Sequence, residues 1–171
     1  MMDISVIKAN ETNQEYGILV GETAPKQLLE FINVRCPYCK KWFEETRDTL
    51  DEAIAAKKIQ RLIKLVDRQK ESLQRGNVMH RFVTTNDAQQ TLADLTKIFD
   101  TQAQWGHLSL EEVAAFAKNE LQLTEHNHLD YAEKLVAETE RANIKFVPTV
   151  IIDSHIFDET IDQDTLKSYF N

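Results

Sequence analysis

The chain has 171 residues, of which 42% are hydrophobic and 28% are charged, with only four Gly and three Pro. This composition is sufficient for the core of one domain, and it excludes collagen-like, low-complexity and wholly disordered chains. The formal net charge is −8, so nucleic acids and anionic membrane surfaces would be repelled on average. No apolar run approaches the roughly 20 residues that cross a bilayer. We therefore expect neither a nucleic acid nor a membrane as partner.

The N-terminal sequence bears on the compartment. Residues 1–8 show no basic start, no long apolar stretch and no small-residue cleavage site. A secretory signal peptide requires these features. We therefore expect a cytoplasmic protein.

The first part of the chain predicts strands around one helical region. Short apolar runs at 4–7 and 16–20 are typical of strands and are expected to pair as a ribbon. The run 28–34 is almost continuously apolar, as in a strand that is buried on both faces. Apolar residues then recur at helical spacing over 42–54, and a second strand is predicted over 59–66. A strand, a helix and a strand in this order predict a βαβ unit.

The middle of the chain is predicted to be helical. Residues 67–77 are polar and indicate an exit from the sheet. Asn86 is expected to cap one helix, Ser109 and Glu112 form a capping box before another, and a further helix carries Leu129. We expect these consecutive helices to pack on one side of the sheet. Strand patterns return at 146–153 and 155–157, and residues 162–170 predict a final short helix.

The two cysteines of the chain, Cys36 and Cys39, form one Cys-x-x-Cys motif. Pro37 suits the first position of a helix, so Cys36 is expected at the helix N-cap. Unpaired N–H groups and the helix dipole stabilise a thiolate there, and Arg35 and Lys40 add positive charge. Cys39 follows about one helical turn later. The motif therefore predicts Cys36 as the attacking thiol of disulfide exchange and Cys39 as the resolving thiol.

Half of a zinc site is the alternative interpretation of a Cys-x-x-Cys motif. A structural zinc site needs two further ligands. The chain has no other cysteine, and His126 and His128 lie far along it. We therefore expect no metal at the cysteines.

Two further residues near these segments favour redox chemistry. Glu30 interrupts the apolar strand before Cys36, and a carboxyl group desolvated there would have a raised pKa and could exchange a proton with Cys39. The alternative is a solvated Glu30 at a strand edge. Pro148 stands in a strand-like run although Pro cannot donate to a sheet ladder. A cis bond after Val147 is one explanation, but the general frequency of cis bonds alone favours a trans bond at the strand entrance.

The motif Cys36-Pro37-Tyr38-Cys39, preceded by Glu30 in its strand and followed by Val147-Pro148, resembles the thioredoxin superfamily. The long helical stretch before Val147 resembles its DsbA-like branch, and this resemblance implies a bacterial protein. The resemblance implies an α/β, thioredoxin-like fold with a mixed central sheet and an inserted all-helical subdomain. We expect residues 1–66 and 143–171 to form the thioredoxin-like domain and residues 67–142 to form the insertion.

The resemblance also implies roles for individual residues. It implies a cis bond at Pro148 beside Cys36, and it makes Glu30 the buried acid of the family. Substrate is expected to contact Pro37, Tyr38, Val147 and Pro148, with the backbone of Val147 pairing with a substrate peptide. No cofactor is expected, because the electrons reside on the cysteine pair.

The predicted function is that of a thiol–disulfide oxidoreductase acting on protein or peptide thiols. DsbA oxidases typically have His between their cysteines, and Tyr38 stands there in this chain, so we expect a less oxidising pair. The alternative is a DsbA-like cytosolic adaptor that binds a regulator protein for proteolysis by ClpXP and uses the cysteines for redox sensing. Kappa-type glutathione transferases share the inserted-helix layout, but they usually lack a complete Cys-x-x-Cys. The sequence does not predict the oligomeric state.

Overall fold

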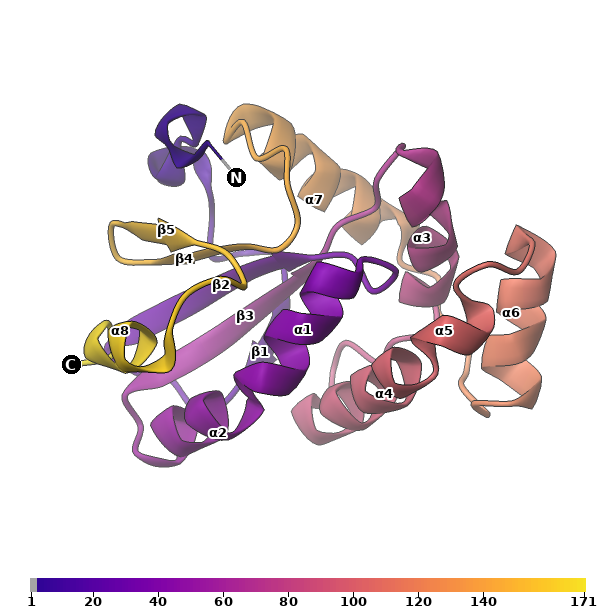
Figure 1. Cartoon of the computed structure of the whole chain (residues 1–171), viewed down its shortest axis with the longest axis horizontal. Coiled ribbons are helices and arrows are strands. Elements are labelled where there is room, and N and C mark those ends of the chain that lie inside the picture. The colour runs from indigo at the N-terminus through magenta and orange to yellow at the C-terminus, as the bar shows by residue number, and fades with distance from the viewer. Residues whose placement is uncertain (1–2) are drawn as a thin grey trace.

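The computed structural model describes residues 3–171 and contains a five-stranded sheet in the order β1-β3-β2-β4-β5 (Figure 1). The strands are β1 (Ile18–Val20), β2 (Lys26–Ile32), β3 (Ile59–Leu65), β4 (Thr149–Ile152) and β5 (His155–Phe157). Strands β2 and β3 are parallel, whereas β1 pairs with β3, β4 with β2 and β5 with β4 in antiparallel fashion. The sheet is therefore mixed, and the predicted α/β class is confirmed.

Helices connect and cover these strands. The helices are α1 (Pro37–Glu45), α2 (Arg47–Ala55), α3 (Gln74–His80), α4 (Ala88–Asp100), α5 (Gln102–Trp105), α6 (Leu110–Asn119), α7 (Leu129–Arg141) and α8 (Gln163–Ser168). Short 3₁₀ turns occupy Ile4–Val6, Ala9–Glu11 and Glu71–Leu73. Helices α3 to α7 all lie between β3 and β4 in the chain, as the helical pattern predicted.

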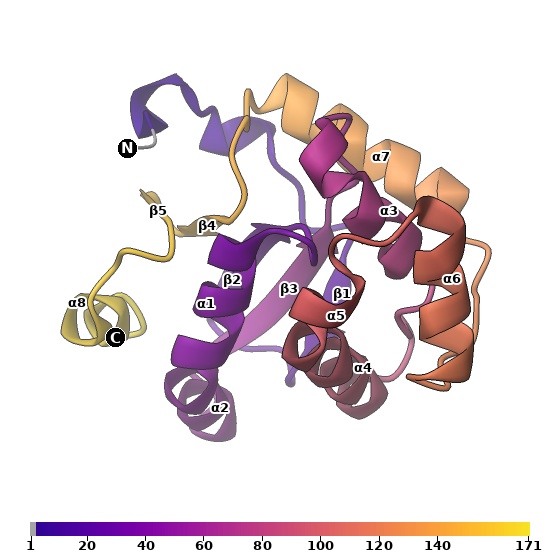
Figure 2. The ribbon, with the colours of Figure 1, turned by 45° about the vertical axis from the view of Figure 1, so that its right-hand side comes forward.

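The sheet lies between two layers, which Figure 2 shows nearly edge-on. On one face, Leu29 and Phe31 of β2 pack with Ala142 and Ile144, which follow α7. On the other face, Leu28 and Ile32 of β2 belong to the larger core, which includes these residues of α1 and α2: Trp42, Phe43 and Leu50. Strand β2 is thus covered on both faces, as its continuous apolar pattern predicted.

A buried ion pair fixes α7 to its face of the sheet. The Nζ atom of Lys64 in β3 lies 2.6 Å from Oε1 of Glu138 in α7, and both side chains are inaccessible to solvent. The ammonium group also donates to the carbonyl oxygen of Asn13 at 2.7 Å, and the N–H group of Asn13 donates to Glu138 at 2.7 Å. Each charged group therefore has several polar partners, which a buried ion pair requires.

The structure corrects four expectations about these elements. Residues 4–7 do not pair with β1; they form a 3₁₀ turn, and β1 pairs with β3. The helical region over 42–54 is divided at Thr46, where the backbone leaves helical geometry. The cap of α4 is Asp87, whose carboxylate accepts from the N–H group of Gln90, and not Asn86. The inserted helices do not all pack on one side, because Lys64 and the apolar face of β2 draw α7 to the opposite face.

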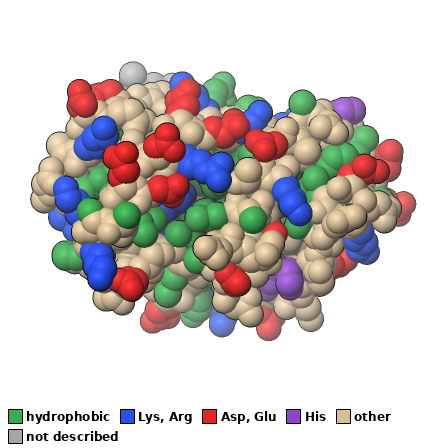
Figure 3. Space-filling view, turned by 90° about the horizontal axis from the view of Figure 1, so that it is seen from below, with side chains coloured by type: hydrophobic (Ala, Val, Ile, Leu, Met, Phe, Trp, Pro, Cys, Tyr) green, Lys and Arg blue, Asp and Glu red, His purple; other side chains and the backbone are tan. Residues whose placement is uncertain are grey.

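The capping box at Ser109 and Glu112 and the 155–157 hairpin are present as predicted. Within residues 3–171, no helix has both the length and the hydropathy that a bilayer crossing requires. Figure 3 shows acidic and basic side chains interspersed with apolar ones over the face seen from below Figure 1. No basic stripe of the kind that binds a nucleic acid backbone is visible on that face.

Candidate active site

Cys36 lies where the central strand passes into α1. Strand β2 ends at Ile32, residues 33–35 form a loop (the active-site loop), and Cys36 is the N-cap of α1 with Pro37 at its first position. The carbonyl oxygen of Cys36 accepts from the N–H groups of Cys39 and Lys40, each at 3.1 Å. The first turn of α1 therefore begins directly at Cys36, and this residue is the N-cap that the sequence predicted.

Several contacts favour the thiolate form of Cys36. A hydrogen bond from the Cys39 thiol is the largest cause that lowers the pKa of Cys36, and burial opposes it. The backbone N–H groups of Cys39 and Tyr38 lower the pKa further, and the negative charge of Glu159 opposes them. The result is a pKa of about 6 for Cys36, so the group is largely ionised at neutral pH.

Cys39 has the opposite environment. Its side chain is fully buried, and burial followed by the neighbouring Cys36 raises its pKa well above the ordinary value. The backbone N–H group of Asn33 donates to the Cys39 sulfur at 3.4 Å. The two thiols therefore differ in the way that disulfide exchange requires, with an ionised outer thiol and a protonated inner one.

The loop before β4 completes the site. The Val147–Pro148 peptide bond is cis, and the Cys36 sulfur lies 3.5 Å from the carbonyl oxygen of Val147, to which it donates when it is protonated. Tyr38 lies beside them, and its side chain is 61% exposed. The structure thus brings together the predicted residues Cys36, Cys39, Pro37, Tyr38, Val147 and Pro148, from two segments more than 100 residues apart.

Glu30 is buried, but it has a partner that the sequence analysis did not include. Its two carboxylate oxygens accept from Nε and Nη2 of Arg61, both at 2.8 Å, and Oε1 also accepts from the indole N–H of Trp42 at 2.8 Å. The alternative of a solvated Glu30 at a strand edge is therefore wrong. A proton on this carboxylate would weaken a buried ion pair, so proton exchange with Cys39 stays a prediction.

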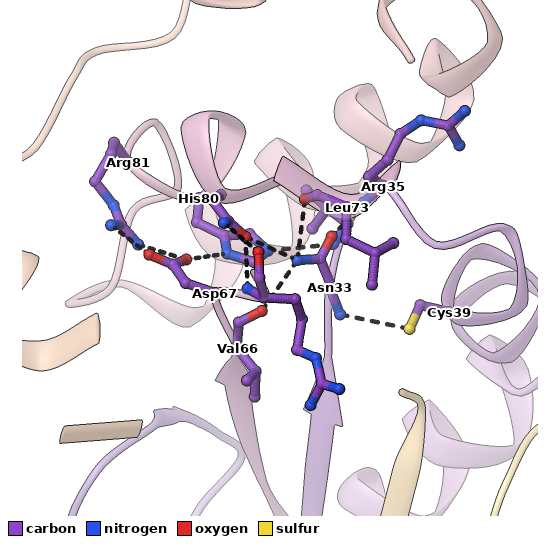
Figure 4. A network of polar contacts seen from close by, with 11 residues as sticks. Asn33, Arg35, Cys39, Val66, Asp67, Leu73, His80 and Arg81 are labelled. Carbon is purple, nitrogen blue, oxygen red and sulfur yellow. Dashed lines mark hydrogen bonds and ion pairs between the residues drawn. The ribbon is translucent and has the colours of Figure 1, made fainter. Parts of the chain in front are cut away.

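A buried polar network holds the active-site loop from the side of the insertion (Figure 4). The amide of Asn33 donates to the carbonyl oxygen of Val66 at 3.0 Å and accepts from the N–H group of Arg35 at 2.9 Å. Nε2 of His80 accepts from the N–H group of Val34 at 3.2 Å, and Nδ1 of His80 lies 2.8 Å from Asp67. Burial lowers the pKa of His80, which fits the neutral ring that this arrangement needs.

Three further contacts connect the insertion to the same loop. The side-chain amide of Gln102 donates to the carbonyl oxygens of Val34 at 2.7 Å and Cys36 at 3.3 Å. Nε of Arg35 donates to the carbonyl oxygen of Gly106 at 2.7 Å, and the Arg35 charge does not contribute to the lowered pKa of Cys36. At Gly76 a Cβ atom would lie 2.0 Å from Oδ1 of Asn33, so only glycine permits this approach. The insertion is thus in direct contact with the loop that positions the thiols.

Sequence reasoning missed these positioning residues. His80 and Gln102 lie in helices whose periodicity says nothing about which distant backbone group they meet. Gly76 was a usable signal, because a glycine within a helix costs stability and usually has a packing reason.

Comparison with known proteins agrees with this geometry. A family model described as thioredoxin matches residues 13–171. No curated protein matches the chain. A solved structure of a conserved protein of unknown function from Enterococcus faecalis V583 has 48% sequence identity and a TM-score of 0.97, covering 99% of this chain and 97% of that one.

Two more distant structures share the fold. Oxidised BdbD from Bacillus subtilis has 15% identity and a TM-score of 0.70, covering 96% of both chains. A periplasmic thioredoxin-like protein from Salmonella enterica serovar Typhimurium has 16% identity and a TM-score of 0.68, covering 99% of this chain and 96% of that one. The chain therefore belongs to the thioredoxin family, as the resemblance at Cys36-Pro37-Tyr38-Cys39 predicted.

Proposed function

We propose that this chain is a thiol–disulfide oxidoreductase that exchanges disulfides with protein or peptide thiols, with the cytoplasm as its location. The observation that carries the proposal is the contrast between the two thiols. Cys36, with a pKa of about 6, lies at a helix N-cap against the Val147–Pro148 bond, and Cys39 lies buried beneath it with a raised pKa.

The reaction follows from this contrast. The Cys36 thiolate attacks one sulfur of a substrate disulfide, forms a mixed disulfide with it and releases the other sulfur as a thiolate, which takes a proton. Cys39 then loses its proton and attacks the Cys36 sulfur, which releases the second substrate thiol. Two electrons pass from the cysteine pair to the substrate, and the reverse sequence oxidises a substrate dithiol.

The side chains around Cys36 suit a peptide substrate. The backbone of Val147 lies beside the reactive sulfur, and the exposed Tyr38 and Phe146 offer apolar surface next to it. A protein named as a putative protein-disulfide isomerase, from Pseudomonas syringae, shares the fold at 15% identity with a TM-score of 0.63, covering 91% of this chain and 98% of that one.

The reduction potential of the Cys36–Cys39 pair tests the proposal. The protein is equilibrated in graded glutathione buffers, and the oxidised fraction is counted by thiol trapping. We expect a value of about −200 to −270 mV, in the range of disulfide reductases. Failure of the pair to form and break a disulfide would overturn the proposal. The variant Cys36→Ser distinguishes this function from the adaptor alternative. Partner binding by an adaptor would survive this substitution, whereas disulfide exchange would not.

A further inference from the structure

A cavity lies next to the active site, and its lining includes Val147, whose carbonyl oxygen is 3.5 Å from the Cys36 sulfur. Its volume is about 350 Å³, and its lining comes from three segments, namely Tyr38 of α1, residues 146–148 and residues 158–160. Two large apolar side chains on its rim are exposed, Tyr38 by 61% and Phe146 by 50%. The cavity is therefore placed to receive the residues that flank the reacting cysteine of a substrate.

One wall of this cavity is acidic. Asp158 and Glu159 follow β5 directly, and both are half-buried. Oδ1 of Asp158 accepts from the N–H and hydroxyl groups of Thr160 at 2.9 and 2.6 Å. Within residues 3–171, neither carboxylate has a cationic group within 4.0 Å. A carboxylate that is partly desolvated without a counter-ion is costly, so the wall has an unmet preference for a cation.

The pKa of Glu159 reflects this situation. Burial raises it, the adjacent Asp158 raises it further, and the more distant Lys41 compensates only in part. Glu159 also acts on the reactive thiols, because its charge works to raise the pKa of both Cys36 and Cys39. The charge of Glu159 is the smallest of the causes that act on the pKa of either cysteine, and it has the same direction at both.

We propose that Asp158 and Glu159 select substrates that carry a lysine or arginine beside the reacting cysteine, an inference that rests on the proposed function. The cationic group would lie against the acidic wall while the apolar part of its side chain contacts Tyr38 and Phe146. By neutralising Glu159, the substrate would also remove a negative charge that raises the pKa of Cys36. A substrate of the opposite charge, including glutathione with its two carboxylates, is disfavoured at the same wall.

The test uses three small disulfides of similar size and different charge. Cystamine carries two ammonium groups, bis(2-hydroxyethyl) disulfide is neutral, and 3,3′-dithiodipropionate carries two carboxylates. The fully reduced protein is mixed with each of them at pH 7, and loss of the Cys36 thiol is followed by quenching and thiol trapping. The rate with the neutral reagent is the reference for each variant, which corrects for any change in the reactivity of Cys36 itself.

We expect the wild type to favour cystamine over the dianion by more than a short neutral cysteine peptide does under the same conditions. Glu159→Gln is expected to reduce this ratio about threefold to tenfold, and Asp158→Asn to reduce it by a smaller factor. High salt is expected to reduce the wild-type ratio as well. A matched control is Glu111→Gln, an exposed glutamate of α6, the helix that lies far from β5 in Figure 1. This variant tests whether the overall charge of −8 is responsible.

The outcomes separate the two proposals. If the neutral reagent oxidises the protein but the ratio is the same in the wild type, Glu159→Gln and Glu111→Gln, the acidic wall has no selective role and the oxidoreductase function stands. If Glu111→Gln lowers the ratio as much as Glu159→Gln, the preference belongs to the whole molecule and the inference is overturned. If no reagent forms a disulfide with the protein, the proposed function itself fails and the inference fails with it.

Discussion

The buried imidazole of His80 accepts a hydrogen bond from the backbone N–H group of Val34, two residues before the reactive Cys36. His80 belongs to α3 of the insertion, whereas Val34 belongs to the loop that follows the central strand. Asp67, two residues beyond the end of β3, contacts the other ring nitrogen at 2.8 Å. The geometry of the thiol site is therefore determined partly by a segment that lies outside the βαβ unit.

Replacing His80 by leucine is expected to destabilise the protein by about 1–3 kcal/mol, because the buried N–H group of Val34 loses its acceptor. Urea unfolding of the reduced and oxidised forms measures the change. His107→Leu is the control, because that histidine is exposed. Equal stability of His80→Leu and the wild type would show that the contact between His80 and Val34 contributes nothing.

The pH dependence of stability provides a second test of His80. Burial lowers its pKa in the folded protein below the ordinary ~6.5, so the unfolded chain binds the additional proton first. The stabilisation is therefore complete above pH ~6.5 and is lost as pH falls through the folded pKa. Urea midpoints between pH 7 and 5 should fall less steeply for His80→Leu than for the wild type. If the urea midpoints of the two proteins fall equally with pH, the protonation of His80 does not contribute to this loss of stability.

Alkylation of the reduced protein by iodoacetamide is expected to accelerate with pH around a midpoint of about 6, which is the pKa of Cys36. Cys39→Ala removes the thiol whose hydrogen bond is the largest cause of this low pKa, so the midpoint should move upward. Thiolate absorbance at 240 nm gives the same midpoint without a reagent. An unchanged midpoint in Cys39→Ala would assign the low pKa to the helix N-terminus alone.

The lowered pKa of Cys36 also makes the free energy of unfolding of the reduced protein depend on pH. The pKa of Cys36 lies below its unfolded value of ~8.5, so the unfolded chain binds more protons between these values. Stability of the reduced protein should therefore rise with pH from about 6 to 8.5, and the contribution is lost as pH falls through the folded pKa. The oxidised protein lacks this thiol and should lack this part of the dependence.

Removing one partner of the Lys64–Glu138 pair is expected to cost about 3–5 kcal/mol, because the other charge stays buried without compensation. Glu138→Leu and Lys64→Met are the single variants, and the double variant should recover much of the loss. Equilibrium unfolding of all three in urea gives the coupling energy. If the double variant is as unstable as the sum of the single ones, the pair has no favourable coupling.

The features that could be read from the sequence are those encoded by adjacent residues. Cys36 at an N-cap needs only Pro37 after it and an apolar strand before it, and the capping box of α6 needs only Ser109 and Glu112. These signals depend on local backbone geometry, so they remain valid whatever the tertiary structure is.

The charged partners of buried residues could not be read in this way. Arg61 and Lys64 stand in a segment that was recognised as a strand from its apolar residues, yet both side chains are buried. Arg61 meets Glu30 because β2 and β3 pair in a particular register, and Lys64 meets Glu138 because α7 crosses that face of the sheet. Such contacts depend on tertiary structure, which no local pattern encodes.

The last prediction concerns Glu30 and separates its two possible roles. If Glu30 takes the proton of Cys39, Glu30→Gln should slow the release of substrate from the Cys36 mixed disulfide about 100-fold or more, and should slow the attack by Cys36 much less. Stopped-flow release of a thionitrobenzoate group first attached to Cys36 measures the second step directly. The single variant also leaves Arg61 buried and unpaired, so its stability must be measured as well.

The double variant Glu30→Gln/Arg61→Met separates the loss of a proton acceptor from the effect of an unpaired Arg61. It eliminates both charges, so it should regain stability relative to Glu30→Gln while release stays slow, because no carboxylate is left to accept the proton. Slow release in a restabilised protein would assign proton transfer to Glu30. Release at the wild-type rate in the double variant would show instead that the Glu30–Arg61 pair is structural and that the proton of Cys39 leaves by another route.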